Sequence, residues 1–234
     1  MRGFMYGDIY YLILVLPAML IALIAQARVR SAFTKYSKIP TRGGQVGTTA
    51  AQMVMSRNNV YGVNIVPVAG SMTDHYDPKK NIIALSEPVI HSSSIAAVGV
   101  AAHEAGHASQ YAAKYVPIRV RNSILPIAKF SQPVSWIMIV IGFILPVQYS
   151  FFITIGIVLF SVAVLFQVVT LPIEFDASRR AMEALSASGQ YSQEELSGVK
   201  KVLSAAAMTY VAGAAVALAQ LVRLLLISGR RNRY

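Results

Sequence analysis

The sequence contains no cysteine and few charged residues. Without cysteine the chain forms no disulfide bond and offers no thiolate ligand, so any bound metal must rest on His, Asp or Glu. Only 13% of the 234 residues are charged and 55% are hydrophobic, whereas an ordinary soluble domain has about a quarter charged residues. This composition argues against a globule surrounded by water, a disordered chain and a nucleic-acid-binding protein. The net charge of +11 fits a membrane protein whose helices are flanked by Lys and Arg.

Charged residues are missing from three long stretches, 9–27, 130–173 and 202–222. A membrane-spanning helix needs about 20 apolar residues, so the first and third stretches each hold one helix and the middle stretch holds two. The segment Pro146–Ser150 is the natural turn within the middle stretch. The sequence therefore predicts four membrane helices, near residues 9–27, 130–146, 151–173 and 203–228.

Two polar regions separate these helices. Residues 28–129 are long enough to bury a modest core, and residues 174–201 form a shorter polar piece. The predicted fold is mainly α: a four-helix integral membrane protein with a small cytoplasmic α+β domain. Its segments are an N-terminal membrane helix (1–27), a cytoplasmic region (28–129), a transmembrane hairpin (130–173), a cytoplasmic helix (174–201), and a C-terminal membrane helix with a basic tail (202–234).

The basic residues predict the orientation. If both polar regions lie on one side, that side carries 16 Lys and Arg, against 4 on the other side: Arg2, Arg230, Arg231 and Arg233. The positive-inside rule then places the polar regions in the cytoplasm of a multi-pass protein. The basic tail opposes this assignment unless the last segment does not cross fully. Arg223, late in the last helix, can reach the interface with its long side chain.

The N-terminus has an alternative interpretation as a secretory signal peptide, because Ala25-Gln26-Ala27 resembles a cleavage site. The apolar run is too long for a signal peptide, and Arg28 and Arg30 follow it at once. A retained membrane anchor is favoured.

The motif HExxH occupies residues 103–107, within the proline-free, helix-favouring stretch 95–113. On a helix, residues i and i+4 share a face, so His103 and His107 can bind one metal ion. Glu104 lies one step around the helix and can contact a water on that metal. This arrangement is typical of zinc metallopeptidases. The alternative is a pair of structural histidines satisfied by hydrogen bonds.

A catalytic zinc needs a third protein ligand. The hairpin at 130–173 leaves and re-enters the same side, which brings Glu174 back beside the His103 helix. Asp176 is the alternative ligand, and a carboxylate favoured by the helix dipole is the non-functional explanation for Glu174. The other candidates at the site are structural residues or oxyanion stabilisers: His75, Tyr76 and His91.

Several segments together resemble one family, the YugP-like neutral membrane zinc metallopeptidases of prokaryotes. The matching segments are Thr73–Pro78, Leu85–Glu87, Val100–Ala108 with Gln110, and Pro172–Ala181. The resemblance covers nearly the whole chain and implies a prokaryotic cell membrane. It also implies a gluzincin-type domain with one Zn²⁺ ion on His103, His107 and Glu174, and Glu104 as the general base.

Related membrane gluzincins carry an Asp four residues after the ligand Glu, where this chain has Ser178. Ser178 or Asp176 would then orient a ligand histidine. In gluzincin-like enzymes an edge strand over the active-site helix pairs with extended substrate. The candidate is the β-prone stretch Asn81, Ile82, Ile83, Ala84, Leu85 and Ser86.

Short sequence patterns predict the remaining elements of the cytoplasmic region. A second β-prone run covers 63–68, a turn follows at 76–80, and residues 28–44 are expected to be a connector. Thr48 or Thr49 is expected to cap a short helix, and Ser92–Ser94 to cap the His103 helix.

The predicted function is that of a membrane-embedded zinc endopeptidase acting on peptide or protein substrates, membrane-associated ones included. The alternative is a zinc-binding membrane scaffold or regulator without peptidase activity. A transporter is disfavoured because the membrane segments hold essentially one ionisable residue, Arg223. The sequence specifies neither the physiological substrate nor the oligomeric state.

Overall fold

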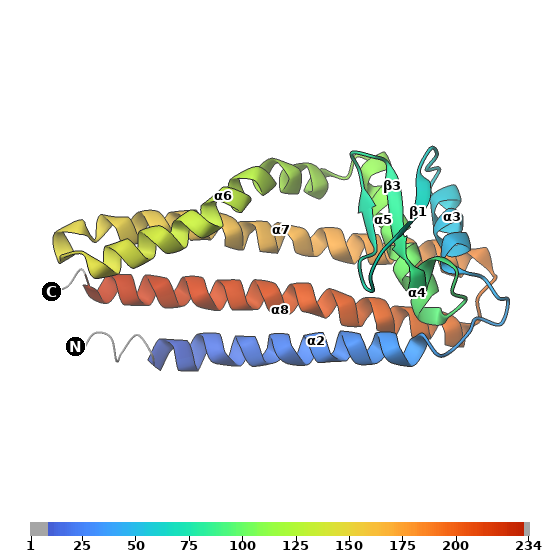
Figure 1. Ribbon diagram of the computed structural model, residues 1–234, viewed down its shortest axis with the longest axis horizontal. Coiled ribbons are helices and arrows are strands. Elements are labelled where there is room, and N and C mark those ends of the chain that lie inside the picture. Colours follow the sequence, from blue (N-terminus) through green and yellow to red (C-terminus); the bar gives the residue numbers. More distant parts are fainter. Residues whose placement is uncertain (1–8, 232–234) are drawn as a thin grey trace. The chain divides into compact units, whose positions relative to one another are not determined.

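A computed structural model describes residues 9–231, with side chains to residue 229. The chain is mainly helical and has one small sheet (Figure 1). In chain order the elements are η1 (Tyr11–Val15), α2 (Leu16–Tyr36), α3 (Gly47–Arg57), β1 (Asn64–Val68), β2 (His75–Asp77), β3 (Ile82–Ser86), α4 (Glu87–Ile90), α5 (Ile95–Ala112), α6 (Val116–Ile144), η2 (Val147–Tyr149), α7 (Phe151–Ser188) and α8 (Gln193–Arg231).

The chain divides into two compact units. In the described part of the chain, the apolar unit comprises residues 9–25, 119–171 and 209–231, and the polar unit comprises residues 26–118 and 172–208. Helices α2, α6, α7 and α8 contribute residues to both.

Within residues 9–231, four helices are long and apolar enough to cross a membrane, which agrees with the predicted number. They are Tyr11–Tyr36, Val116–Ile144, Val147–Ser188 and Gln193–Gly229. The turn predicted at Pro146–Ser150 is also confirmed, since η2 joins α6 to α7 there. Arg2 and Arg233, which enter the count of basic residues, lie outside the described residues.

The helices are longer than the predicted spans, and two predicted segments are wrong. The connector expected at 28–44 is helical as far as Tyr36. Arg and Lys are good helix formers, and Lys35 in the last turn suits the helix dipole. The separate helix expected at 174–201 does not exist, because α7 continues through Pro172 to Ser188 and α8 begins at Gln193. One proline removes a single helix hydrogen bond, and the rest of the helix is retained.

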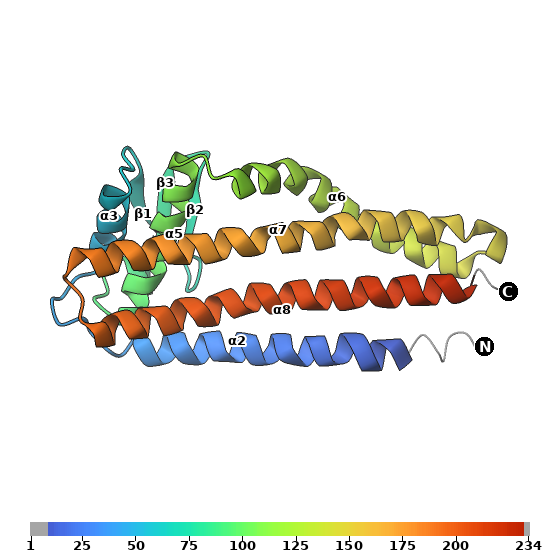
Figure 2. The same cartoon turned by 180° about the vertical axis from the view of Figure 1, so that it is seen from behind.

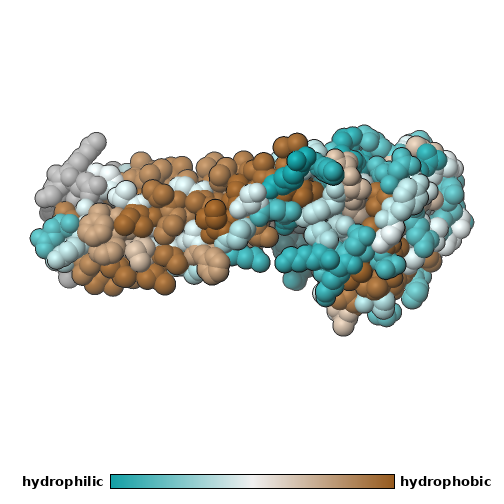
Figure 3. All heavy atoms as spheres, turned by 90° about the horizontal axis from the view of Figure 1, so that it is seen from above, coloured by the Kyte–Doolittle hydropathy of each residue, from teal (hydrophilic) through white to brown (hydrophobic). Residues whose placement is uncertain are grey.

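The apolar unit has a small core and a hydrophobic surface. Its buried cluster joins α6, α7 and α8 through Ile139, Ile153, Ile157, Phe160, Val164 and Leu224. Many large apolar side chains, such as Ile13, Leu23 and Val158, are exposed. Brown, hydrophobic residues dominate this unit on the face drawn in Figure 3, and teal, hydrophilic residues dominate the polar unit. The exposed apolar surface of the helices suits contact with lipid.

The sheet of the polar unit has the strand order β1-β3-β2. Strand β1 runs parallel to β3, with Ile65 opposite Ile83, and β2 runs antiparallel to it, with Tyr76 opposite Ile83. Figure 2 shows β2 and β3 beside α5. The predicted edge strand, Asn81–Ser86, is therefore wrong in its position, because β3 is central and both of its sides are hydrogen-bonded. Sequence reasoning missed β2, whose residues were expected partly in a turn.

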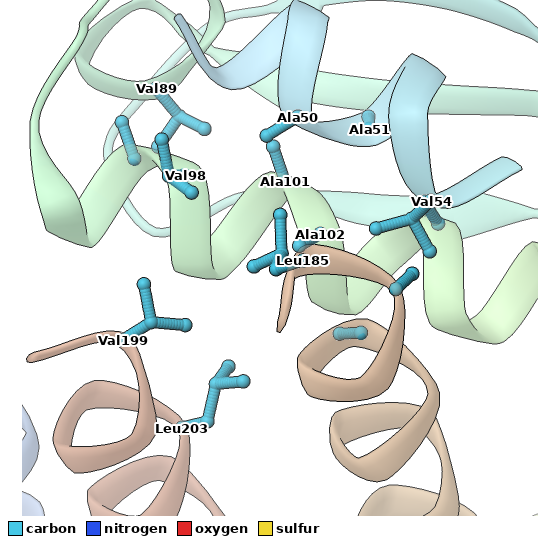
Figure 4. Close-up of a cluster of buried hydrophobic side chains, with 14 of the residues drawn as sticks. Ala50, Ala51, Val54, Val89, Val98, Ala101, Ala102, Leu185, Val199 and Leu203 are labelled. Atoms are coloured by element: carbon cyan, nitrogen blue, oxygen red, sulfur yellow. The ribbon is translucent and has the colours of Figure 1, made fainter. Parts of the chain in front are cut away.

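Helix α5 lies at the centre of the polar unit (Figure 4). One side packs against Ala50, Ala51 and Val54 of α3, and the other side faces Leu185 of α7 and Val199 of α8. Most α5 residues in this core are alanines with no exposed surface, which allows the helices to approach closely.

The start of α5 is confirmed in detail. The Ser94 hydroxyl accepts a hydrogen bond from the backbone N–H of Ala97, at 3.2 Å, as an N-cap does. The cap predicted for α3 is wrong, since Val46 occupies that position without a side-chain bond. The Thr48 hydroxyl instead donates to the carbonyl of Ile90 at 2.7 Å and joins α3 to α4.

Candidate metal centre

Helix α5 presents two histidines on one face of the polar unit. His103 and His107 are one helical turn apart, and their ring centroids are 4.7 Å apart at an interplanar angle of 80°. Both side chains are largely buried. Each ring can therefore direct one nitrogen toward a shared point while its other nitrogen contacts the protein.

Helix α7 brings Glu174 to this pair. The Oε2 atom of Glu174 lies 3.3 Å from Nε2 of His103 and 3.6 Å from Nε2 of His107. The ligand atoms of the three residues all lie within 4.8 Å of one another. Two imidazoles and one carboxylate are a ligand set that suits zinc.

Gly106 allows the two helices to come this close. A Cβ atom at this position would lie 2.3 Å from the backbone carbonyl oxygen of Ala177. Because Gly106 lies between the two histidines and Ala177 follows Glu174 on α7, this contact sets the spacing of the site. Any larger residue would push the carboxylate away from the imidazoles.

The Nδ1 atoms of the two histidines have different partners. Nδ1 of His103 lies 3.1 Å from the hydroxyl of Ser178, one turn after Glu174 on α7. Nδ1 of His107 lies 3.0 Å from Oε1 of Gln110, which is fully buried. Such outer contacts orient metal-binding histidines.

Asp176 contacts the outer residues rather than the three converging ligand atoms. Its Oδ2 accepts hydrogen bonds from Nε2 of Gln110 at 2.9 Å and from Nε of Arg180 at 2.7 Å. Its Oδ1 pairs with Arg179. The side chain is thus committed to one amide and two guanidinium groups. Among the described residues, the group that could hold a metal consists of His103, His107 and Glu174.

The site holds negative charge that has no hydrogen-bond donor. Oε2 of Glu174 is buried and accepts no hydrogen bond within the described part of the chain. A buried carboxylate oxygen without a donor is costly unless a cation neutralises it. The residues present therefore fit a divalent metal ion, which would contact this oxygen and the two Nε2 atoms.

Glu104 adds a second buried carboxylate close to His107. Burial lowers the pKa of His107, whereas the carboxylates of Glu174 and Glu104 raise it, and the pKa ends above its ordinary value. The surroundings of His107 thus favour a positive charge on or beside the ring. A proton or a metal ion can supply that charge.

The remaining candidates have other contacts. Nδ1 of His75 lies 2.8 Å from the carbonyl of Thr73, and this histidine is exposed. The hydroxyl of Tyr76 donates to Asn81 at 2.9 Å, and its ring packs edge-on against Tyr111 at 5.5 Å. His91 is exposed after α4.

Sequence reasoning assigned no role to Gln110 or Arg180. The signal available was the position of Gln110, three residues after His107 and on the same helix face.

Comparison with known proteins identifies the family. Residues 11–229 match the family model described as "putative neutral zinc metallopeptidase". The chain belongs to this family. It is 42% identical over 217 residues to the "putative membrane protease YugP" of Bacillus subtilis (strain 168), covering 93% of this chain and 96% of that one. No solved structure matches the chain.

Proposed function

We propose that this protein is a zinc-dependent endopeptidase of the membrane. The observation that carries the proposal is the convergence of two Nε2 atoms and one carboxylate oxygen, from His103, His107 and Glu174, beside the buried Glu104. Membership of the family and similarity to a membrane protease support it. His103, His107 and Glu174 would hold one zinc ion. When bound, zinc would polarise the carbonyl group of the substrate and lower the pKa of a water molecule.

Glu104 is the general base in this proposal. It lies between the two histidines on α5, directly after His103, and carries its negative charge close to His107. It takes the proton of the attacking water and passes that proton to the leaving amine. Burial keeps this carboxylate away from bulk solvent, which favours proton transfer within the site.

We assign the strand that pairs with an extended substrate to β2, because the central strand β3 has no free edge. A peptide adds to a sheet only at a free edge. Strand β2 is an edge strand, and it contacts α5, the helix of both histidines. An extended peptide along His75–Asp77 would therefore lie next to the metal-binding helix, without requiring any existing strand pair to open.

The proposed location is the prokaryotic cell membrane, with the polar unit in the cytoplasm. The excess of Lys and Arg in the polar segments supports this orientation. Glu174 belongs to the same continuous helix as a candidate membrane span, Val147–Ser188. Membrane-associated peptides are therefore the proposed substrate class, although water-soluble chains are usable in an assay.

The test is hydrolysis of casein by the protein purified in detergent. We expect cleavage with zinc, loss of cleavage after treatment with a chelator, and recovery when zinc is restored. Cleavage that persists without metal contradicts the zinc mechanism. One bound zinc with no cleavage of casein or a peptide library supports a zinc-binding scaffold instead.

A further inference from the structure

Gln110 is a fully buried amide whose polar atoms all have partners. Its Nε2 donates to the backbone carbonyl of Ile173 at 2.7 Å and to Oδ2 of Asp176 at 2.9 Å. Its Oε1 faces Nδ1 of His107 at 3.0 Å. Helices α5 and α7 of the polar unit are therefore joined at one side chain that has 0% exposure.

These partners determine the orientation of the amide. A carbonyl oxygen and a carboxylate oxygen only accept hydrogen bonds, so the NH₂ group must point toward Ile173 and Asp176. The opposite oxygen then points at His107. Because an amide oxygen only accepts, Nδ1 of His107 must carry a proton and donate it.

The consequence lies on the other side of the ring. A neutral imidazole with its proton on Nδ1 has a free lone pair on Nε2. That lone pair points toward Oε2 of Glu174, 3.6 Å away. In its neutral form, His107 therefore has its lone pair on the nitrogen that metal binding requires.

His103 is constrained less strictly. Its Nδ1 faces the hydroxyl of Ser178, and a hydroxyl can either donate or accept. This contact holds the ring, but it is compatible with both neutral tautomers. The two ligand histidines therefore differ in how their proton is placed.

We propose that Gln110 is a positioning residue that fixes the tautomer of His107, and that Asp176 with Arg180 holds Gln110 in place. Arg180 neutralises Asp176 through a 2.7 Å bond and lies over the ring of Tyr115. The proposal rests on the proposed function, since it concerns the same metal ligands. It adds a series of hydrogen bonds from Arg180 through Asp176 and Gln110 to His107.

The first test measures zinc affinity by competition with a chromophoric chelator. Gln110→Met keeps the length of the side chain and removes the acceptor, so we expect affinity to fall by about 10–100-fold. Gln110→Glu retains an acceptor oxygen opposite His107 in either protonation state, so we expect affinity within about 3-fold of the parent chain's. Gln52→Met, at an exposed position on α3, is the control and leaves affinity unchanged.

Stability separates positioning from packing. Both Gln110 variants lose the amide donors to Ile173 and Asp176, so both are expected to melt at lower temperature than the parent chain. Only Gln110→Met is expected to lose zinc affinity. Equal loss of zinc affinity in both variants, in step with their melting temperatures, would overturn the proposal.

The second test needs no substitution and no peptidase activity. In the metal-free parent protein at alkaline pH, ¹⁵N spectra of the four imidazoles report which nitrogen carries the proton. We expect the His107 proton on Nδ1, in slow exchange with water, while exposed His75 and His91 exchange quickly. A proton on Nε2 of His107 would contradict the proposal. Failure of the proposed function would appear differently, as absent hydrolysis with both results intact.

Discussion

The two units of the molecule use apolar residues in opposite ways. In the polar unit, small side chains such as Ala50 of α3 and Ala101 and Ala102 of α5 have no exposed surface and pack the helix of the candidate metal centre against its neighbours. In the apolar unit, large side chains such as Leu23 are mostly exposed, and the buried cluster is small. The polar unit therefore buries its apolar residues as a domain in water does, whereas the apolar unit exposes large residues, which suits contact with lipid.

The difference between the two units also accounts for the position of the candidate metal centre. The described group that could hold a metal lies in the polar unit, where helices approach closely enough to bring three ligand atoms together. Close approach requires glycine and alanine at the contacts, as at Gly106 and Ala177. We therefore expect substitutions at buried positions of the polar unit to have larger effects than the same substitutions at exposed positions of the apolar unit.

The largest expected effect comes from Glu104→Gln. Removal of the proposed general base should lower kcat by about 10²–10⁴-fold while zinc remains bound, as measured by peptide hydrolysis and metal analysis. Glu194→Gln makes the same change at an exposed position and should leave kcat unchanged. Hydrolysis at the parent rate in Glu104→Gln would remove this residue from the mechanism.

Leucine truncation compares the two units directly. Leu185 of the polar unit is 0% exposed, whereas Leu23 of the apolar unit is 65% exposed. Leu185→Ala should lower the free energy of unfolding by about 2–5 kcal/mol, because it leaves a cavity. Leu23→Ala should lower it by less than about 1 kcal/mol. Thermal unfolding in detergent measures both, and equal losses would contradict the described difference in packing.

Glycine substitution should act with opposite sign at Gly106 of the polar unit and at Gly213 of the apolar unit. Gly106→Ala places a methyl group against a backbone carbonyl at 2.3 Å, so it should destabilise the chain by about 1–3 kcal/mol and weaken zinc binding. Gly213→Ala on α8 meets no atom within 4 Å and should stabilise it by about 0.5–1 kcal/mol. Unchanged zinc affinity in Gly106→Ala would mean that this contact does not set the spacing of the ligands.

The smallest expected effect concerns the exposed ion pair between Arg42 and Glu194. The two charged groups are 2.8 Å apart, with side chains 73% and 84% exposed. Solvent and salt screen such a pair, so Arg42→Ala should cost less than about 1 kcal/mol. The backbone N–H of Arg42 keeps its bond to Glu195 in this variant. A larger loss would show that the pair belongs to a stabilising network.

Much of the site could be predicted because its determinants are local. The spacing of His103 and His107 requires only a helix, and the Ser94 cap and the absence of proline favour one. Glu174 followed from a second local pattern, an uncharged stretch long enough to form a hairpin that returns to its starting side. These inferences needed only helical geometry and the length of a membrane span.

The features that could not be predicted depend on contacts between distant segments. Strand β2 has three residues, which are too few to give a periodic pattern in the sequence. Because β2 was not predicted, the sequence did not show that β3 has a strand on each side. Helices α2 and α7 continue past the predicted spans into the core of the polar unit, where Tyr36 and Leu185 are buried. Gln110 acquires its role only when Ile173 and Asp176 of α7 reach its amide.

The most direct test of the central claim is the zinc content of the purified chain and its single-ligand variants. We predict one zinc per parent chain and one in Glu104→Gln. His103→Ala, His107→Ala and Glu174→Ala should each retain less than about a tenth of that amount, because each removes one of three protein ligands. Full zinc occupancy in any of these three variants, with the fold intact, would contradict the assignment of the metal centre.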